Sequence, residues 1–499
     1  MNISQENLRG HGLTVLKGLL LILIVYSPFF LHLGDLPVRI WDEARLIANT
    51  LEMSENGNYL VPHFKGNPEM WNTKPPLMIW CQLFFLKLIG NEELSFRLPS
   101  AIAGFLTSLM IVLVFSRYFK SYWFGLLAVL VLVTSNGYVG EHVTRTGDYD
   151  ALLTFFTTLY AFGFFLYLES GKQKYLHLFF AGLALAVLTK SVQGLLFLPA
   201  LALYPLMTGN MLKILKNKWI YIDLVLVSLV VAGYYFFRES VNPGYIDAVF
   251  NNELGGRYLE TNENHRQAAS YYLDLLTGAH FGTWFFLLPL GFFAGFSFEN
   301  GIFKRIAIFS LTLSVVYLLI ISYSGTKLAW YDAPLFPFLA ILVSLVMYKI
   351  FSLLTSGLNK GKFNVPWLLP ALLVVSVFFL PYRAMLDKVY KPKETSADAE
   401  FCMISHFLRD AVKGDVEISG HYVCYDGYNV HLTYYTDQLN KKGKKVFFFD
   451  KARLRPGDQV VFSQHHMQQF MEKTYLFEET GSYYNVKKIR INGIRNQQD

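Results

Sequence analysis

Long apolar runs recur along this chain from Leu13 to about Leu380. An α-helix needs about 20 apolar residues to cross the roughly 30 Å hydrocarbon core of a bilayer, and the runs reach that length. Only 16% of the 499 residues are charged, whereas an average soluble domain carries about 25% charged residues. These features predict an all-α polytopic membrane protein over residues 1–384.

The hydropathy pattern predicts eleven transmembrane helices with the N-terminus inside. The first segment, Leu13 to Leu33, lacks a small-x-small cleavage site, so we expect it to remain as the first span. The expected spans lie near residues 13–33, 97–116, 122–140, 150–168, 174–188, 191–208, 219–237, 281–298, 305–323, 330–350 and 366–382.

Basic residues set the orientation, because Lys and Arg concentrate in cytoplasmic loops. With the N-terminus inside, the cytoplasmic connections are SRYFKS, ESGKQK, MLKILKNK, ENGIFKR and the region around NKGKF, and each carries at least two basic residues. The two long connections, residues 34–96 and 238–280, are rich in acids and fall outside. Counting the apolar stretch 75–90 as a span would invert every later loop. We therefore expect it to be a helix that lies along the membrane surface or packs against the bundle.

After residue 384 the composition becomes polar. A helical pattern, AEFCMISHFLRDAV, is followed by short strand-like runs, KVFFFD, DQVVFS and YYNVKKIRI. Residues 385–499 are therefore expected to form a small soluble α/β domain on the external face, and this domain shows no motif that indicates a function. Its cysteines, Cys402 and Cys424, could form a disulfide, although two free thiols are the simpler interpretation.

Acids and bases from four separated external loops gather at one membrane boundary. A carboxylate at a lipid boundary is costly unless it is paired or functional. An interfacial ion pair would explain any one of these residues, but it explains the whole set less well. Cations can hold a lipid-linked phosphate, and a carboxylate can orient or deprotonate an acceptor. The loops are WDEAR with Asp42, Glu43 and Arg45, and WNTKPPL with Lys74; RTGDYDALL with Asp148 and Asp150; ELGGRYLE with Glu253 and Arg257; and SGTKLAWYDAPLFP with Lys327 and Tyr331.

The order of these motifs over residues 35–340 resembles the polytopic membrane glycosyltransferases of the GT-C class. The stretches that carry the resemblance are WDEARLIANTLEMSENGNYLVP, TKPPL, RLPSAIAGFL, RTGDYDALLTFF, LTKSVQGLLFLPAL and SGTKLAWYDAPLFPFLAIL. Within that class the chain is most similar to the bacterial branch that contains the aminoarabinose transferases, which modify lipid A. That branch is related to protein O-mannosyltransferases, in families 39 and 83.

The resemblance implies a residue set and a reaction. It implies catalytic roles for Asp42 and Asp150, with Asp148 the alternative second acid, and donor-phosphate contacts from Arg45, Lys74, Lys327 and Tyr331. Glu43, Arg257 and Lys190 would support the site, although snorkelling to the membrane interface explains Lys190 equally well. The implied reaction transfers a sugar with inversion from a polyprenyl-phosphate donor to a lipid, glycan or protein acceptor. It would take place on the periplasmic side of a bacterial inner membrane, with no nucleic-acid partner.

Two departures from the family pattern concern metal and acceptor. Aminoarabinose transferases usually have an acid where this chain has Thr73, and a histidine in the later loop where it reads NNELGGRYL. A divalent metal is thus possible, but the sequence specifies no cofactor and names no metal ligand. His63, His265, His465 and His466 are expected to be surface residues.

Two other functions compete with glycosyl transfer. A transporter or flippase of a lipid-linked substrate would show ionisable residues near the middle of its spans, or repeated halves with interrupted helices. The sequence shows neither pattern. A non-catalytic scaffold would leave the gathering of acids and bases without an explanation.

Overall fold

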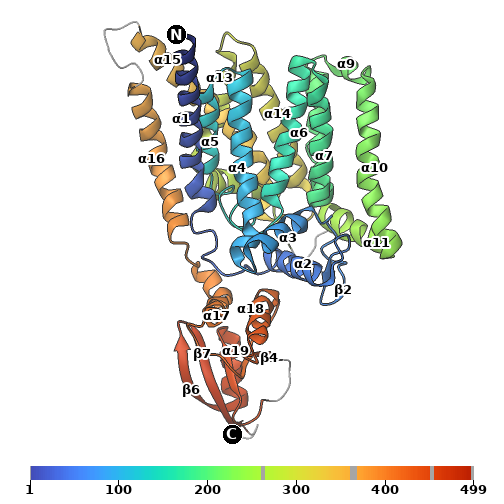
Figure 1. The fold of residues 1–499 in the computed structure, drawn as a ribbon, viewed down its shortest axis with the longest axis vertical. Coiled ribbons are helices and arrows are strands. Elements are labelled where there is room, and N and C mark those ends of the chain that lie inside the picture. The colour runs from blue at the N-terminus through green and yellow to red at the C-terminus, as the bar shows by residue number, and fades with distance from the viewer. Residues whose placement is uncertain (1, 260–264, 360–367, 450–453, 496–499) are drawn as a thin grey trace.

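The structure is a computed structural model that describes residues 2–259, 265–359, 368–449 and 454–495. A bundle of long helices lies above a smaller domain that contains the C-terminus (Figure 1). Each of the eleven expected spans overlaps a helix, although several of these helices are shorter than the expected span. These helices are α1 (Asn2–Phe30), α4 (Glu93–Tyr118), α5 (Tyr122–Val133), α6 (Asp150–Ser170), α7 (Gln173–Lys190), α8 (Leu198–Met207), α10 (Lys218–Val241), α13 (Leu288–Phe296), α14 (Ile302–Tyr323), α15 (Phe336–Asn359) and α16 (Leu368–Tyr390).

Within the described ranges, seven helices are long and apolar enough to cross a membrane, or eight if a bent pair is one span. That pair, Tyr271–His280 and Gly282–Phe296, bends by 112°. The expected spans 122–140 and 281–298 are therefore not continuous helices. The first breaks because Gly137 N–H donates to His280 O at 3.0 Å instead of continuing α5. Only glycine allows this approach, since a Cβ at Gly137 would lie 2.4 Å from the ring of Phe336.

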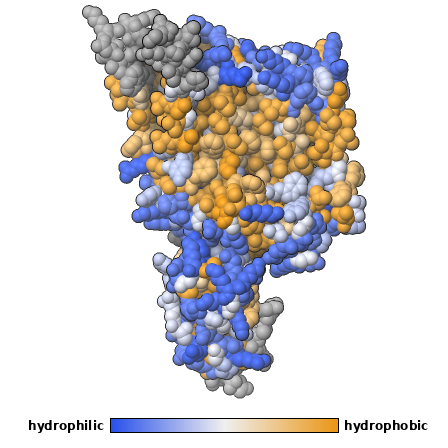
Figure 2. Space-filling model, viewed as in Figure 1, coloured by the Kyte–Doolittle hydropathy of each residue, from blue (hydrophilic) through white to orange (hydrophobic). Residues whose placement is uncertain are grey.

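On the face shown in Figure 2, a broad apolar belt covers the bundle, and hydrophilic surface lies above and below it. Helix α10 shows why the belt suits lipid. Only 6% of the most apolar 18-residue stretch of α10 is buried inside the protein. Its apolar side chains, such as Leu229 and Phe236, are exposed, and in water such a patch would be unfavourable.

Two helices of the first long loop, α2 (Asp42–Asn56) and α3 (Leu77–Ile89), lie across the lower ends of the bundle (Figure 1). Helix α3 covers the stretch 75–90, so that stretch does not cross the bundle. Between the two helices, β1 (His63–Phe64) and β2 (Asn67–Pro68) form a short antiparallel hairpin. Helix α2 begins with Asp42 and Glu43, two acids that favour a helix N-terminus.

Short helices form parts of the second long loop, of the connections between long helices and of the ends of some candidate spans. They are the 3-10 segments Ser191–Leu195, Gly282–Leu287 and Ala329–Leu335, the π segments Phe250–Leu259 and Leu276–His280, and α9 (Met211–Leu215), α11 (Tyr245–Val249) and α12 (Tyr271–Leu275).

The C-terminal domain has the expected α/β composition. A five-stranded sheet runs in the order β4-β3-β5-β7-β6, with β3 parallel to β4 and β5 and with β7 antiparallel to β5 and β6. Helix α16 continues to Tyr390, so the bundle extends past the expected boundary at residue 384. The elements are α17 (Ser396–Lys413), β3 (His421–Val423), α18 (Val430–Lys441), β4 (Phe447–Phe448), β5 (Gln459–Phe462), α19 (His465–Thr474), β6 (Tyr475–Tyr483) and β7 (Val486–Ile494).

This domain packs on the first long loop. Val38, Ala44 and Ile47 share one apolar core with residues of α17 and α18. At the same contact, Tyr435 Oη accepts from Val38 N–H at 2.8 Å and donates to Glu93 at 2.6 Å. The loop that contains Asp42 is therefore buried between the bundle and the soluble domain.

Candidate active site

Asp42, His142 and Asp148 form the centre of the candidate site. One ligand atom from each, a carboxylate oxygen or an imidazole nitrogen, lies within 4.8 Å of the others. Asp42 is the first residue of α2, and the other two belong to the loop between α5 and α6. The site thus joins residues that are about 100 positions apart in the sequence.

The loop from 140 to 148 places its two site residues through local hydrogen bonds. His142 has a φ of 60°, and its N–H donates to Thr146 Oγ1 at 2.6 Å. The Thr146 hydroxyl then donates to Asp148 Oδ2 at 2.6 Å. The His142 ring stacks on Trp330 with 3.7 Å between ring centroids, and its Nδ1 lies 3.2 Å from Asp148 Oδ2.

His142 was not among the residues predicted from the sequence, although it lies six positions before Asp148 in GEHVTRTGD. Burial alone would lower the pKa of His142, but Asp148, followed by Asp42 and Glu141, raises it to about 9. The imidazole is therefore a cation near neutral pH, held by the carboxylates around it.

Asp150, the expected second acid, lies at the N-terminus of α6 and is buried. Lys190 Nζ, at the end of α7, donates to both of its carboxylate oxygens at 2.6 Å. Lys190 also lies 5.0 Å from the centre of the Tyr331 ring. Lys190 therefore belongs to the interior of the site and does not extend to the membrane surface, and it joins two expected site residues, Asp150 and Tyr331.

Glu43 points away from Asp42 and is fully buried. Its carboxylate accepts from Arg97 at 2.7 and 2.8 Å and from Gly147 N–H at 2.8 Å. Burial would raise the pKa of Glu43, but the Arg97 guanidinium outweighs it and lowers the pKa. Glu43 therefore ties the start of α2 to the backbone next to Asp148. No side chain fits at Gly147, where a Cβ would lie 2.7 Å from Phe96 O.

Two of the expected phosphate-binding cations have carboxylate partners. Arg45 donates to both oxygens of Glu69 at 2.6 and 2.7 Å. Lys74 lies 3.1 Å from Glu253 and 5.4 Å from the centre of the Tyr149 ring. Lys74 therefore contacts the residue that lies between the two aspartates in the sequence.

The 324–331 segment approaches the same region. Lys327 Nζ donates to Ser324 O at 2.8 Å, and burial, followed by nearby Arg266, lowers the pKa of Lys327. Tyr331 is buried and lines a small cavity together with Tyr258 and Tyr317. The Arg257 side chain lies outside the described side chains.

The Asp42, His142 and Asp148 atoms suit a divalent cation. They offer two carboxylates and one imidazole, which are ligands that zinc and other divalent metals accept. Asp148 Oδ1 and His142 Nδ1 are also buried without a hydrogen-bond partner among the described residues.

The three cysteines are free, so Cys402 and Cys424 do not pair, and both are buried.

Comparisons with known proteins agree with this fold. A family model described as dolichyl-phosphate-mannose-protein mannosyltransferase matches residues 73–235. An undecaprenyl phosphate-alpha-4-amino-4-deoxy-L-arabinose arabinosyl transferase of Shewanella sediminis (strain HAW-EB3) is 25% identical over 392 residues, which cover 74% of this chain and 68% of that protein. An enzyme of the same name from Erwinia tasmaniensis is 26% identical over 392 residues, with 76% and 68% covered.

The crystal structure of ArnT from Cupriavidus metallidurans bound to undecaprenyl phosphate has a TM-score of 0.68 to this chain, covering 96% of this chain and 98% of that one, at 15% identity. This chain has the GT-C fold and resembles the aminoarabinose transferases. The expected fold class is thereby confirmed. The part of this GT-C chain that matches the family model includes Lys74, Asp148, Asp150 and Lys190, whereas Asp42 lies before it.

Proposed function

We propose that this protein is an integral membrane glycosyltransferase. It transfers a sugar, with inversion, from a polyprenyl-phosphate donor to a lipid, glycan or protein acceptor on the periplasmic face of a bacterial inner membrane. The observation that carries the proposal is the position of Asp42, within 4.8 Å of His142 and Asp148, in a region that also contains Arg45 and the Lys74–Glu253 and Lys190–Asp150 pairs. The undecaprenyl phosphate named for the related ArnT structure supports the donor class.

Asp42 is the proposed base. In an inverting transfer, the acceptor's hydroxyl or amine attacks the anomeric carbon opposite the bond to phosphate. A new bond to the sugar forms as the sugar–phosphate bond breaks, and the acceptor proton passes to the Asp42 carboxylate. Asp42 is partly exposed, whereas Asp148 and Asp150 are buried, so Asp42 is the most accessible of the three acids.

Arg45, Lys74 and Lys327 would stabilise the charge that develops on the departing polyprenyl phosphate. Glu69 and Glu253 hold the first two of these cations before the donor binds. A phosphate would then share or replace those carboxylate contacts. Such pre-positioned cations need little rearrangement at the moment of reaction.

The two aspartates of RTGDYDALL would have separate tasks. Asp148 lies beside Asp42 and completes the centre, whereas Asp150 holds Lys190 next to Tyr331. Asp42, His142 and Asp148 would together hold a divalent cation, which would supply Lewis-acid charge for the leaving phosphate. Metal binding would require His142 to lose its proton.

The proposal can be tested on protein purified in detergent. Mass spectrometry should detect a co-purifying polyprenyl phosphate, and polyprenyl-phosphate sugars offered with candidate acceptors should give glycosylated product. Flux of the lipid-linked sugar across vesicles, without transfer to any acceptor, would instead identify a flippase.

The orientation has its own test. In a cysteine-free background, Lys216→Cys near α9 and Thr480→Cys in β6 both place an exposed thiol on the surface. In intact spheroplasts, a membrane-impermeant thiol reagent should label position 480 and leave position 216 unlabelled. The reverse pattern would place the site and the C-terminal domain in the cytoplasm.

A further inference from the structure

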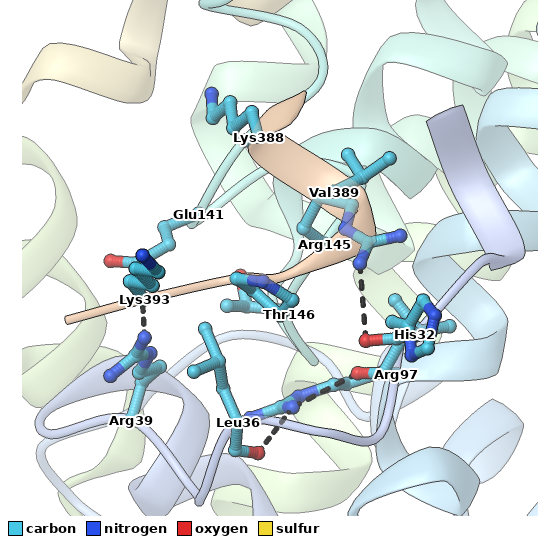
Figure 3. Close-up of a pocket in the computed structure, with 13 residues that line it drawn as sticks. His32, Leu36, Arg39, Arg97, Glu141, Arg145, Thr146, Lys388, Val389 and Lys393 are labelled. Carbon is cyan, nitrogen blue, oxygen red and sulfur yellow. Dashed lines mark hydrogen bonds and ion pairs between the residues drawn. The ribbon is translucent and has the colours of Figure 1, made fainter. Parts of the chain in front are cut away.

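A basic pocket is lined by residues of the 140–148 loop, and Asp42, His142 and Asp148 are not among its lining residues (Figure 3). It encloses about 100 Å³ between the end of α1, the start of α4, this loop and the end of α16. Its charged lining is dominated by cations. Arg39, Arg97, Arg145, Lys388 and Lys393 face one acid, Glu141.

The cations of this pocket differ in their partners. Arg39 contacts Glu141 at 2.9 Å and Glu394 at 2.7 Å, and Arg97 is bonded to Glu43. In the described part of the chain, by contrast, Arg145 donates only to backbone carbonyls, the nearest being Leu31 O at 2.8 Å. Lys388 likewise donates to Val139 O at 2.8 Å. Among the described residues, these two cations of the pocket therefore have no carboxylate hydrogen-bond partner, although Asp35 acts on Arg145 and Glu141 acts on Lys388 from a greater distance.

Burial and the neighbouring cation both disfavour the charged form of Arg145, and Asp35 offsets only part of their effect. Burial, followed by repulsion from Arg97, lowers the pKa of Arg145 to about 10. Uncompensated buried charge is unfavourable, and an anion with several oxygen acceptors would relieve it. Planar guanidinium groups are well suited to phosphate.

The position of the pocket indicates where the anion comes from. Helices α1 and α16 run side by side at the edge of the bundle (Figure 1), and their outer ends border the pocket. Both present apolar side chains outward, such as Leu23, 71% exposed, on α1 and Leu380, 69% exposed, on α16. An acyl chain could lie along this apolar surface while its headgroup enters the pocket.

We propose that this pocket binds the phosphate headgroup of an anionic bilayer lipid, at a site separate from the candidate active site. Thr146 lines the pocket and also donates to Asp148. A bound headgroup would therefore brace the loop that positions Asp148 and His142.

The test is a titration of the full-length protein in detergent with dioctanoyl phosphatidylglycerol, with the bound lipid counted by native mass spectrometry. Lys393→Ala removes an exposed lining cation and should weaken binding about tenfold. Lys391→Ala, an exposed lysine two residues away that does not line the pocket, should change binding less than twofold. Glu141→Gln removes the competing acid and should strengthen binding.

Several results would overturn the proposal. Equal weakening by Lys391→Ala would show only a diffuse charge effect, and equal binding of dioctanoylglycerol would exclude the phosphate. Inorganic phosphate binding as tightly as the lipid would identify a soluble anion as the ligand. If Lys74→Ala lost lipid binding while Lys393→Ala bound the lipid as well as the unsubstituted protein, the probe would occupy the donor site.

Discussion

The two faces of the 140–148 loop carry opposite electrostatic environments. On the face toward Asp42, the cations Arg45, Lys74 and Lys190 each have a carboxylate partner. On the face toward α1 and α16, Arg145 and Lys388 have only carbonyl partners among the described residues. Glu141 and His142 are neighbours in the sequence but lie on different faces of the loop. Glu141 lines the basic pocket, whereas His142 contacts Asp148.

This difference distinguishes two ways to hold an anion. Cations that already have carboxylate partners are fixed in position, which suits a phosphate that must bind and then leave. Cations without such partners favour an anion that stays bound. The first arrangement suits turnover, and the second suits a resident lipid.

The largest expected effect comes from Asp42. Asp42→Asn keeps the size of the side chain but removes its basicity, so turnover should fall by about 10² to 10⁴, the usual range for general acid–base catalysis. Donor binding should persist. Glu55→Gln, an exposed acid on the same helix, is the matched control. Near-normal turnover in Asp42→Asn, measured with a verified donor and acceptor, would show that Asp42 is not the base.

The next comparison separates the two aspartates of RTGDYDALL. Asp150→Asn leaves Lys190 buried without its carboxylate partner. The free energy of unfolding should therefore fall by about 3 to 5 kcal/mol. Adding Lys190→Met removes the stranded charge and should restore most of that stability. Thermal and denaturant unfolding in detergent measure both variants.

Asp148→Asn should act differently, with a fall in turnover of about 10²-fold and a smaller loss of stability than Asp150→Asn, because the variant keeps an acceptor for Thr146 and His142 can lose its proton. If Asp150→Asn abolished turnover while the fold stayed intact, and Asp148→Asn remained active, the second acid would be Asp150, as the family register implies.

A smaller effect is expected for the lysines that we expect to bind the donor phosphate. Lys74→Ala and Lys327→Ala each remove a lysine cation that we expect to contact the donor phosphate. The affinity for the donor should therefore fall about tenfold. Lys87→Ala, an exposed lysine on α3 bonded to Tyr59, should not change it. Glu253→Gln should strengthen donor binding, because Lys74 then has no competing carboxylate. Unchanged donor affinity in both lysine variants would assign these residues to packing.

The smallest effect concerns pH. The pKa of folded His142 is about 9, above the ordinary histidine value near 6.5. Charged His142 therefore contributes stability fully below about pH 6.5, and this contribution is lost as pH rises through about 9. In protein freed of divalent metal with a chelator, so that His142 can hold its proton, the unfolding midpoint should fall by about 2 °C over this range.

His142→Gln should remove that part of the pH dependence. His63→Gln, whose ring bonds the Val61 carbonyl, should leave the dependence in place. The same slope in His142→Gln and in the unsubstituted protein would show that another group titrates.

The sequence alone predicted the helical bundle, the order of its helices and the presence of acids and bases in the connections between them. These features depend on hydropathy over about 20 residues and on the charge of short loops, both of which are local. Prolines after Lys74 and the acids at the start of α2 are local signals as well.

Tertiary structure alone decided which acids and bases meet. Asp42 and Glu43 are neighbours, yet one reaches the candidate site and the other bonds Arg97, 54 positions away. Asp148 and Asp150 are two positions apart, but Asp148 precedes α6 while Asp150 sits in its first turn and turns toward Lys190. Partners so distant in sequence are selected by helix packing and burial, and no local pattern contains that information.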